Sequence, residues 1–147
     1  MEKFAIVTRF DDQSKKIGDK IKQVLQSHQY EYNQESPDTV FVVGGDGTYI
    51  KAIHDYMERI PDVKFLGLHT GTLGFFTDYH DNEVDELLEM YLSEKYEISE
   101  YPLLVTEVNG NIYHAVNEIR VENIARTQIL DVHLSDEYLE TFRGTGM

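Results

Sequence analysis

Hydrophobic residues in the first hundred positions follow two alternating patterns. Short apolar runs rich in β-branched and aromatic residues, which predict largely buried strands, occupy 3–9, 39–43 and 63–68. Apolar residues three or four positions apart, which predict amphipathic helices, occupy 17–25, 50–57 and 84–92. Strands that alternate with helices in this way predict an α/β fold, with a mainly parallel sheet in a three-layer domain. Asp11 or Asp12 is expected to cap the first helix.

The pattern changes near residue 100, where strands follow one another without helices. The predicted strands occupy 103–105, 112–121 and 129–134. Asn109-Gly110 separates the first two runs and is a strong signal for a tight β-hairpin. The sequence therefore predicts two domains, an α/β domain over 1–99 and the first strands of an all-β domain over 100–147. We expect the second domain to be incomplete, because its strands would keep open edges and an uncovered face.

Composition narrows the possible functions. The chain has no Cys, which excludes disulfides and thiolate metal sites, and its six His residues show no spacing typical of a metal site. A formal net charge of −14 argues against a nucleic-acid or anionic-membrane partner, because such partners attract basic surfaces. No apolar run is long enough for a signal peptide or a membrane span. We therefore expect a soluble, cytoplasmic protein.

The strongest candidate for chemistry is Gly44-Gly45-Asp46-Gly47-Thr48, which follows the predicted strand at 39–43. Enzymes with this kind of sheet bind ligands at the carboxyl ends of the strands. Glycines around one Asp suit a turn in which the backbone approaches a phosphate closely and some residues adopt positive φ. Thr48 and the first N–H groups of a helix beginning there would face that phosphate. The alternative is a tight turn in which Asp46 merely caps the helix.

Three segments together resemble the NAD kinase family. The motif from Gly44 to Thr48 is similar to a signature that NAD kinases share with diacylglycerol and sphingosine kinases. The segment His69-Thr70-Gly71-Thr72-Leu73-Gly74-Phe75-Phe76 is similar to the Gly-x-Leu-Gly-Phe loop of NAD kinases, and Asn117-Glu118 is similar to their Asn-Glu pair. Phe142-Arg143-Gly144 follows in matching order. The resemblance covers the whole chain and implies a nucleotide-kinase-like first domain.

The resemblance assigns roles to particular residues. Asp46 corresponds to the catalytic carboxylate, which contacts the adenosine ribose of NAD and accepts the proton of its 2′-hydroxyl. The residues that it implies in nucleotide binding are Gly45, Asp46, Gly47, Thr48, Phe75, Asn117, Glu118, Arg143 and Thr145. Thr145 departs from the Asp that is frequent at this position in the family. For Phe75 and Phe76, a place in the nucleotide pocket and a place in the core weigh equally.

The activity implied by the resemblance is transfer of the terminal phosphoryl group of ATP, or in some members of polyphosphate, to the 2′-hydroxyl of the adenosine ribose of NAD, which makes NADP. The sequence does not decide between ATP and polyphosphate or between NAD and NADH. A divalent cation, Mg²⁺, would neutralise the donor phosphates without a dedicated protein cluster to hold it. The family also implies a homodimer or homotetramer. The chain stops before the family's Thr-Pro-x-Gly segment, so we expect the 147-residue polypeptide alone to have little activity.

Two other functions remain open from the sequence. A lipid kinase of the diacylglycerol type shares the motif at Asp46, although the loop at 69–76 and the Asn117-Glu118 pair do not belong to its pattern. A catalytically inactive nucleotide-binding module is compatible with a truncated chain. Separate measurements of NAD binding and NAD turnover distinguish these alternatives, because the inactive module binds without turnover.

Overall fold

The fold was analysed in a computed structural model that describes residues 1–71, 74–123 and 125–146. The chain divides into two units, Met1–Ser99 and Glu100–Met147. The first unit contains a parallel sheet in the order β2-β1-β3-β4-β5. Its strands are β1 (Lys3–Thr8), β2 (Glu31–Tyr32), β3 (Thr39–Val43), β4 (Lys64–His69) and β5 (Tyr79–His80). The predicted parallel sheet is therefore confirmed.

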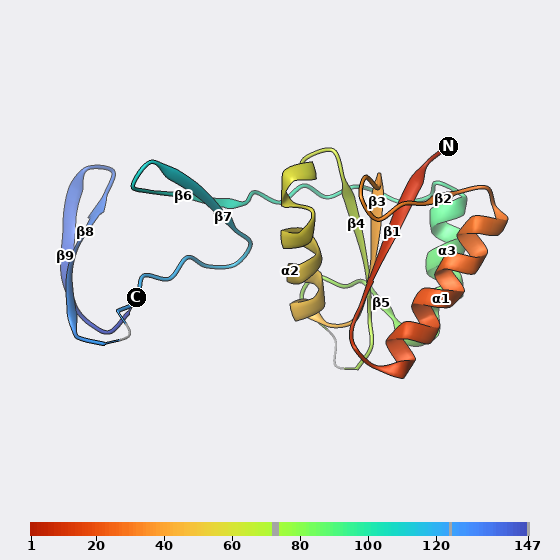
Figure 1. Ribbon diagram of the computed structural model, residues 1–147, viewed down its shortest axis with the longest axis horizontal. Coiled ribbons are helices and arrows are strands. Elements are labelled where there is room, and N and C mark those ends of the chain that lie inside the picture. The colour runs from red at the N-terminus through yellow and green to blue at the C-terminus, as the bar shows by residue number, and fades with distance from the viewer. Residues whose placement is uncertain (72–73, 124, 147) are drawn as a thin grey trace. The chain divides into compact units, whose positions relative to one another are not determined.

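Three α-helices cover the two faces of this sheet. They are α1 (Asp12–Ser27), α2 (Asp46–Asp55) and α3 (Val84–Leu92), with short 3-10 turns η1 (Met57–Arg59) and η2 (Asp81–Glu83). Helices α1 and α3 lie on one face and α2 lies on the other (Figure 1). This arrangement confirms the predicted three layers.

Each face of the sheet has its own hydrophobic core. The core under α1 and α3 includes Ile21, Phe41 and Leu87, all almost fully buried. The smaller core under α2 includes Val40 and Ala52. All five residues of β3 are buried because the central strand of a parallel sheet is covered on both faces.

The start of α1 is fixed by a side-chain cap. The Asp11 carboxylate accepts a hydrogen bond from the Ser14 backbone N–H at 2.9 Å, as the sequence predicted for Asp11 or Asp12. This bond holds the pKa of Asp11 below its usual value. Further along, a Cβ on Gly18 would lie 2.8 Å from Thr8 Cγ2, so glycine lets the helix pack closely against β1.

A hydrogen-bonded cluster lies at the amino ends of the central strands. The Tyr91 hydroxyl donates to Glu2 Oε1 at 2.9 Å and lies 3.0 Å from the Thr39 hydroxyl. Lys64 Nζ lies 3.1 Å from the same Glu2 oxygen. Burial raises the pKa of Tyr91 far above its ordinary value, so the phenol remains a donor at neutral pH. The cluster ties α3 to the start of β3.

The second unit consists of two antiparallel hairpins. Its strands are β6 (Leu104–Val108), β7 (Asn111–Ala115), β8 (Gln128–Leu134) and β9 (Glu137–Gly144). Asn109 and Gly110 both have positive φ, so the predicted Asn-Gly hairpin is confirmed. The predicted strand at 112–121 was too long, because β7 ends at Ala115.

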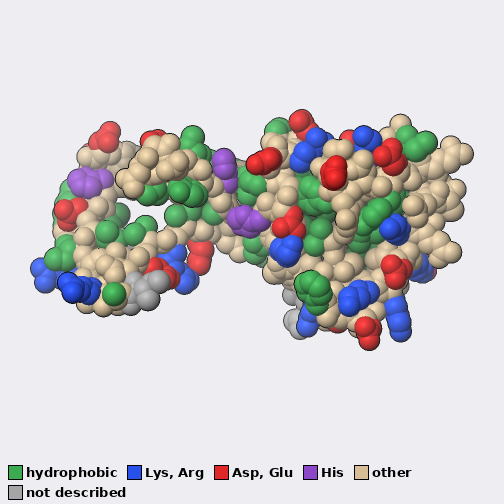
Figure 2. All heavy atoms as spheres, in the orientation of Figure 1, with side chains coloured by type: hydrophobic (Ala, Val, Ile, Leu, Met, Phe, Trp, Pro, Cys, Tyr) green, Lys and Arg blue, Asp and Glu red, His purple; other side chains and the backbone are tan. Residues whose placement is uncertain are grey.

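Many large hydrophobic side chains of these hairpins are exposed, and Figure 2 shows hydrophobic groups on the visible surface of this unit. Those most exposed on the strands include Val105, Ile112, Ile129, Leu134, Tyr138 and Leu139. In the described part of the chain, no helix has the length and apolar character needed to cross a membrane.

We predict that Tyr91→Phe lowers the free energy of unfolding by about 1–2 kcal/mol, because Glu2 loses a hydrogen-bond donor and the Thr39 hydroxyl loses its contact with the phenol oxygen. Urea denaturation of this variant and of Tyr101→Phe, an exposed tyrosine as control, measures the effect. Equal stability of the two variants would show that the cluster contributes nothing.

Candidate active site

Three loops leave the carboxyl edge of the sheet side by side. Backbone hydrogen bonds join them beyond the strand ends: Arg9 N donates to Val43 O at 2.8 Å, and Gly44 N donates to Leu68 O at 2.9 Å. Thr70 N donates to Gly44 O at 3.2 Å. The segments that follow β1, β3 and β4 are therefore held in register where ligands bind to sheets of this kind.

The turn after β3 is shorter than predicted. Helix α2 begins at Asp46, with Gly45 as its N-cap residue, so Asp46 and Gly47 belong to the first helical turn and the helix does not begin at Thr48. A Cβ on Gly44 would lie 2.4 Å from Thr48 Oγ1, so close packing inside the turn requires this glycine.

Close packing inside the turn does not require glycine at positions 45 and 47. Neither residue adopts positive φ; among the glycines of the described residues, Gly71 and Gly110 do. The expectation that the motif contains left-handed backbone was therefore wrong. A Cβ at either position would meet no atom of the residues that the structure describes within 4 Å. The backbone at these two glycines therefore borders open space that a ligand can enter.

The Asp46 carboxylate holds the loop that follows β4. The Phe75 backbone N–H lies 2.9 Å from both oxygens, and the Phe76 N–H donates to Oδ1 at 3.1 Å. A Cβ on Gly74 would lie 2.2 Å from Oδ1, so glycine is required for this approach. The side chain forms no cap on α2, and the alternative that Asp46 merely caps its helix is wrong.

The two phenylalanines of this loop differ in environment. The Phe76 ring stacks on Tyr49, with centroids 5.5 Å apart and planes 13° apart. The Tyr49 hydroxyl donates to the Phe65 carbonyl at 3.3 Å, so the stack rests on the face of the sheet under α2. The Phe75 side chain is 87% exposed. Phe76 therefore anchors the loop, and the Phe75 ring is open to a ligand.

His69 is buried at the end of β4, below the same loop. Its Nδ1 lies 3.2 Å from the Gly71 carbonyl, so Nδ1 carries the proton of that hydrogen bond. Within the described residues, Nε2 has no hydrogen-bond partner, and neither does the buried Thr77 hydroxyl. The His80 ring lies against His69, with centroids 4.0 Å apart. Within the described residues, only one of the two ring nitrogens of His69 is therefore satisfied.

A hollow of about 340 Å³ opens between the end of β1 and the first turns of α2. It is lined by Val7, Thr8, Arg9, Phe10, Gly47, Thr48 and Lys51. Sequence reasoning singled out only Gly47 and Thr48 among these residues. A signal was present, because Arg9 ends the strand predicted over 3–9 and Phe10 directly follows it, at the end where ligands bind.

The remaining predicted residues lie in the second unit. Asn117 lies in a bend after β7 and Glu118 follows it; both are exposed, and Glu118 Oε1 accepts from Arg120 at 3.1 Å. The Arg143 side chain is exposed on β9, opposite Ile129.

Thr145 is also exposed, and its carbonyl accepts from Asn123 N at 2.8 Å. Across the described residues of both units, no group of three His, Asp or Glu side chains could hold a metal ion.

Comparisons with known proteins identify the family of this chain. Residues 7–96 match the family model described as the ATP-NAD kinase N-terminal domain. The NAD kinase of Lactobacillus helveticus is 41% identical over 132 residues, which cover 86% of this chain and 49% of that protein. The chain spans about half the length of the curated relatives that it matches.

Two solved structures share the fold. The match to yeast NADH kinase in complex with NADH covers 99% of this chain and 56% of that protein's chain. Its TM-score is 0.75, and the sequences are 15% identical. The match to the NAD kinase of Archaeoglobus fulgidus in complex with ATP covers 98% of this chain and 58% of that protein's chain. Its TM-score is 0.73, and the sequences are 24% identical. The family model covers more than half of the 147 residues, and the chain therefore belongs to the NAD kinase family.

Proposed function

We propose that the protein is an NAD kinase that transfers the terminal phosphoryl group of ATP to the 2′-hydroxyl of the adenosine ribose of NAD. The observation that carries the proposal is the Asp46 carboxylate, fixed by backbone amides at the open carboxyl edge of the sheet. Membership of the family supports the same activity, and the relatives named above are NAD or NADH kinases.

The geometry suits Asp46 to the part of a general base. A carboxylate offers about four lone-pair directions, and the Phe75 and Phe76 amides use three of them, two on Oδ1 and one on Oδ2. Oδ2 keeps one direction with which to accept a hydrogen bond from the ribose hydroxyl. In a loose phosphoryl-transfer transition state, such a base mainly orients the hydroxyl and takes its proton late.

The other predicted residues would hold the substrates. The exposed Phe75 ring can lie against a flat base, and the open backbone at Gly45 and Gly47 allows close approach of a ribose or phosphate. In the second unit, Asn117 is exposed, and its side-chain amide can both donate and accept hydrogen bonds. We propose that these residues bind NAD, together with Glu118, Arg143 and Thr145.

A divalent cation would accompany the donor. Mg²⁺ prefers oxygen ligands and usually binds through substrate phosphates with one or two protein groups. The Thr48 hydroxyl in the first turn of α2 is a protein oxygen that could join the phosphate oxygens around such an ion. When bound, the ion neutralises phosphate charge, which matters in a chain of net charge −14.

The two rival functions differ in their support. Nothing in the comparisons favours a lipid kinase, because the family model and the relatives are those of NAD kinases. An inactive binding module would retain NAD affinity without turnover. Cytoplasmic location, a homodimeric or homotetrameric assembly and the choice between ATP and polyphosphate stay predictions.

We predict that Asp46→Asn in the full-length protein lowers kcat by about 100-fold or more, because the base is lost. The asparagine oxygen can still accept from the loop amides, so NAD affinity should change less. Asp46→Ala, which removes both functions, should weaken NAD binding as well. Steady-state kinetics and calorimetric NAD titration measure the two effects. A kcat near the wild-type value in Asp46→Asn would mean that Asp46 only anchors the loop.

We predict that Gly47→Ala separates stability from activity. Among the described residues, the added methyl group meets no atom within 4 Å, and alanine favours helix. The free energy of unfolding should therefore stay equal or rise by up to about 1 kcal/mol. Turnover should fall at least about ten-fold, because the methyl group occupies space needed by substrate. Thermal unfolding and a coupled NADP assay on the same preparation make the comparison. Unchanged turnover would show that no substrate approaches Gly47.

A further inference from the structure

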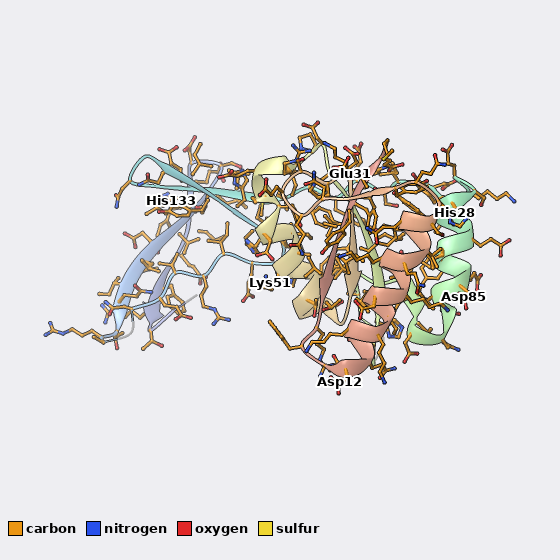
Figure 3. The ribbon with its side chains drawn as sticks, turned by 45° about the vertical axis from the view of Figure 1, so that its right-hand side comes forward. Asp12, His28, Glu31, Lys51, Asp85 and His133 are labelled. Atoms are coloured by element: carbon orange, nitrogen blue, oxygen red, sulfur yellow. The ribbon has the colours of Figure 1, made fainter. Side chains whose placement is uncertain are left out.

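Helix α2 contacts Phe76 with two residues that are three positions apart. The helix, which carries the labelled Lys51 in Figure 3, contributes Asp46 from its first turn and Tyr49 from the next. Residues at this spacing are neighbours on one face of a helix. The Asp46 carboxylate accepts from the Phe76 backbone N–H at 3.1 Å, and the Tyr49 and Phe76 rings stack with centroids 5.5 Å apart. One residue of the loop after β4 is therefore held by α2 at its backbone and at its side chain.

Strand β4 fixes the position of the Tyr49 ring. The Tyr49 hydroxyl donates to the Phe65 carbonyl at 3.3 Å, and the ring lies over Gly67. A Cβ on Gly67 would lie 2.7 Å from Tyr49 Cε2, so this strand has a glycine where the ring needs the space. The same Cβ would lie 2.8 Å from Thr77 Cγ2. Tyr49 and the end of the loop at Thr77 therefore pack against the same point of the strand.

A backbone amide can orient a carboxylate only when the amide itself is fixed. Gly74 has no side chain with which to pack, and the Phe75 ring is 87% exposed and lies against the Phe76 ring. The half-buried Phe76 ring rests in turn on Tyr49. Catalytic groups must be held within about 0.5 Å of their productive position. The stack on Tyr49 therefore bears on how well the loop amides hold Asp46.

We infer that Tyr49 is a positioning residue for phosphoryl transfer, which acts on Asp46 through the ring and the amide of Phe76. The inference rests on the proposed function, in which Asp46 takes the proton of the ribose 2′-hydroxyl. When the Tyr49 ring is removed, the loop amides shift and the carboxylate no longer points at that hydroxyl. The aromatic ring makes the contact with Phe76, so phenylalanine at position 49 can replace tyrosine.

Variants of the full-length protein test this role. Tyr49→Ala removes the ring, Tyr49→Phe keeps it, and Phe76→Ala removes the other half of the stack. Tyr56→Ala is the matched control, because Tyr56 also packs against the core under α2 and donates its hydroxyl to a backbone carbonyl, that of Gln34, at 2.9 Å. Tyr56 lies at the opposite end of the helix from Asp46. Circular dichroism and thermal unfolding establish that each variant is folded at the assay temperature.

Tyr49→Ala should lower kcat at least about ten-fold, with a smaller change in KM for NAD, because a misplaced base costs turnover. Tyr49→Phe and Tyr56→Ala should keep kcat within about two-fold of the wild type. In the Asp46→Asn background, where the base is already lost, Tyr49→Ala should lower kcat no further. Phe76→Ala should lower kcat as Tyr49→Ala does, and it tests the same stack if Tyr49→Ala does not fold.

Amide hydrogen exchange, followed by NMR, gives a readout that needs no turnover. The Phe75 and Phe76 amides should exchange at least about ten-fold faster in Tyr49→Ala than in Tyr56→Ala. Equal exchange in these two variants, or equal losses of kcat, would overturn the inference, as would losses that multiply when Tyr49→Ala is combined with Asp46→Asn. A wild-type protein that forms no NADP would instead refute the proposed function, and hydrogen exchange would still decide whether Tyr49 holds the loop.

Discussion

The hydrogen bonds from the Phe75 and Phe76 amides to the Asp46 carboxylate join two loops that are almost thirty residues apart in sequence. They determine where the loop after β4 lies and which way the carboxylate points. Glycine is needed at position 74 because any side chain there would collide with Asp46. The stack of Phe76 on Tyr49 holds the same loop against α2. A positioned carboxylate is thus a consequence of backbone contacts, and Phe75 is left free to meet a ligand.

Charge imposes a second constraint on the same edge of the sheet. A chain of net charge −14 repels dinucleotides and triphosphates at long range, so binding depends on local groups. The sheet provides these groups at its carboxyl end: the open backbone of Gly45 and Gly47, the first turn of α2, and the cations Arg9 and Lys51. The fold therefore gathers groups that favour phosphate within a small part of a strongly acidic protein.

The layers of the first unit could be predicted from sequence because burial leaves a periodic trace. The stripes of α1 and α3 and the continuous apolar run of β3 all appear in the structure where expected. The two-residue strands β2 and β5 were missed, since two residues carry no period. The turn at Ser135-Asp136 was missed because its positive φ angles fall on residues other than glycine.

The site was only partly predictable for a related reason. Motif residues such as Asp46 and Phe75 stand out by their type and spacing. The partners of Asp46 are backbone N–H groups. Every residue except proline has such a group, so the residue types in the sequence cannot predict these contacts. Which of Phe75 and Phe76 is packed and which is exposed likewise depends on which ring contacts Tyr49. Tertiary packing makes that contact, with Phe76.

A crystal structure of the full-length protein with bound NAD tests the central claim most directly. The account predicts a ribose 2′-hydroxyl within hydrogen-bond distance of an Asp46 oxygen, while the amides of the loop after β4 still hold that carboxylate. A ribose bound beyond the reach of Asp46, with the loop in the same place, would contradict it.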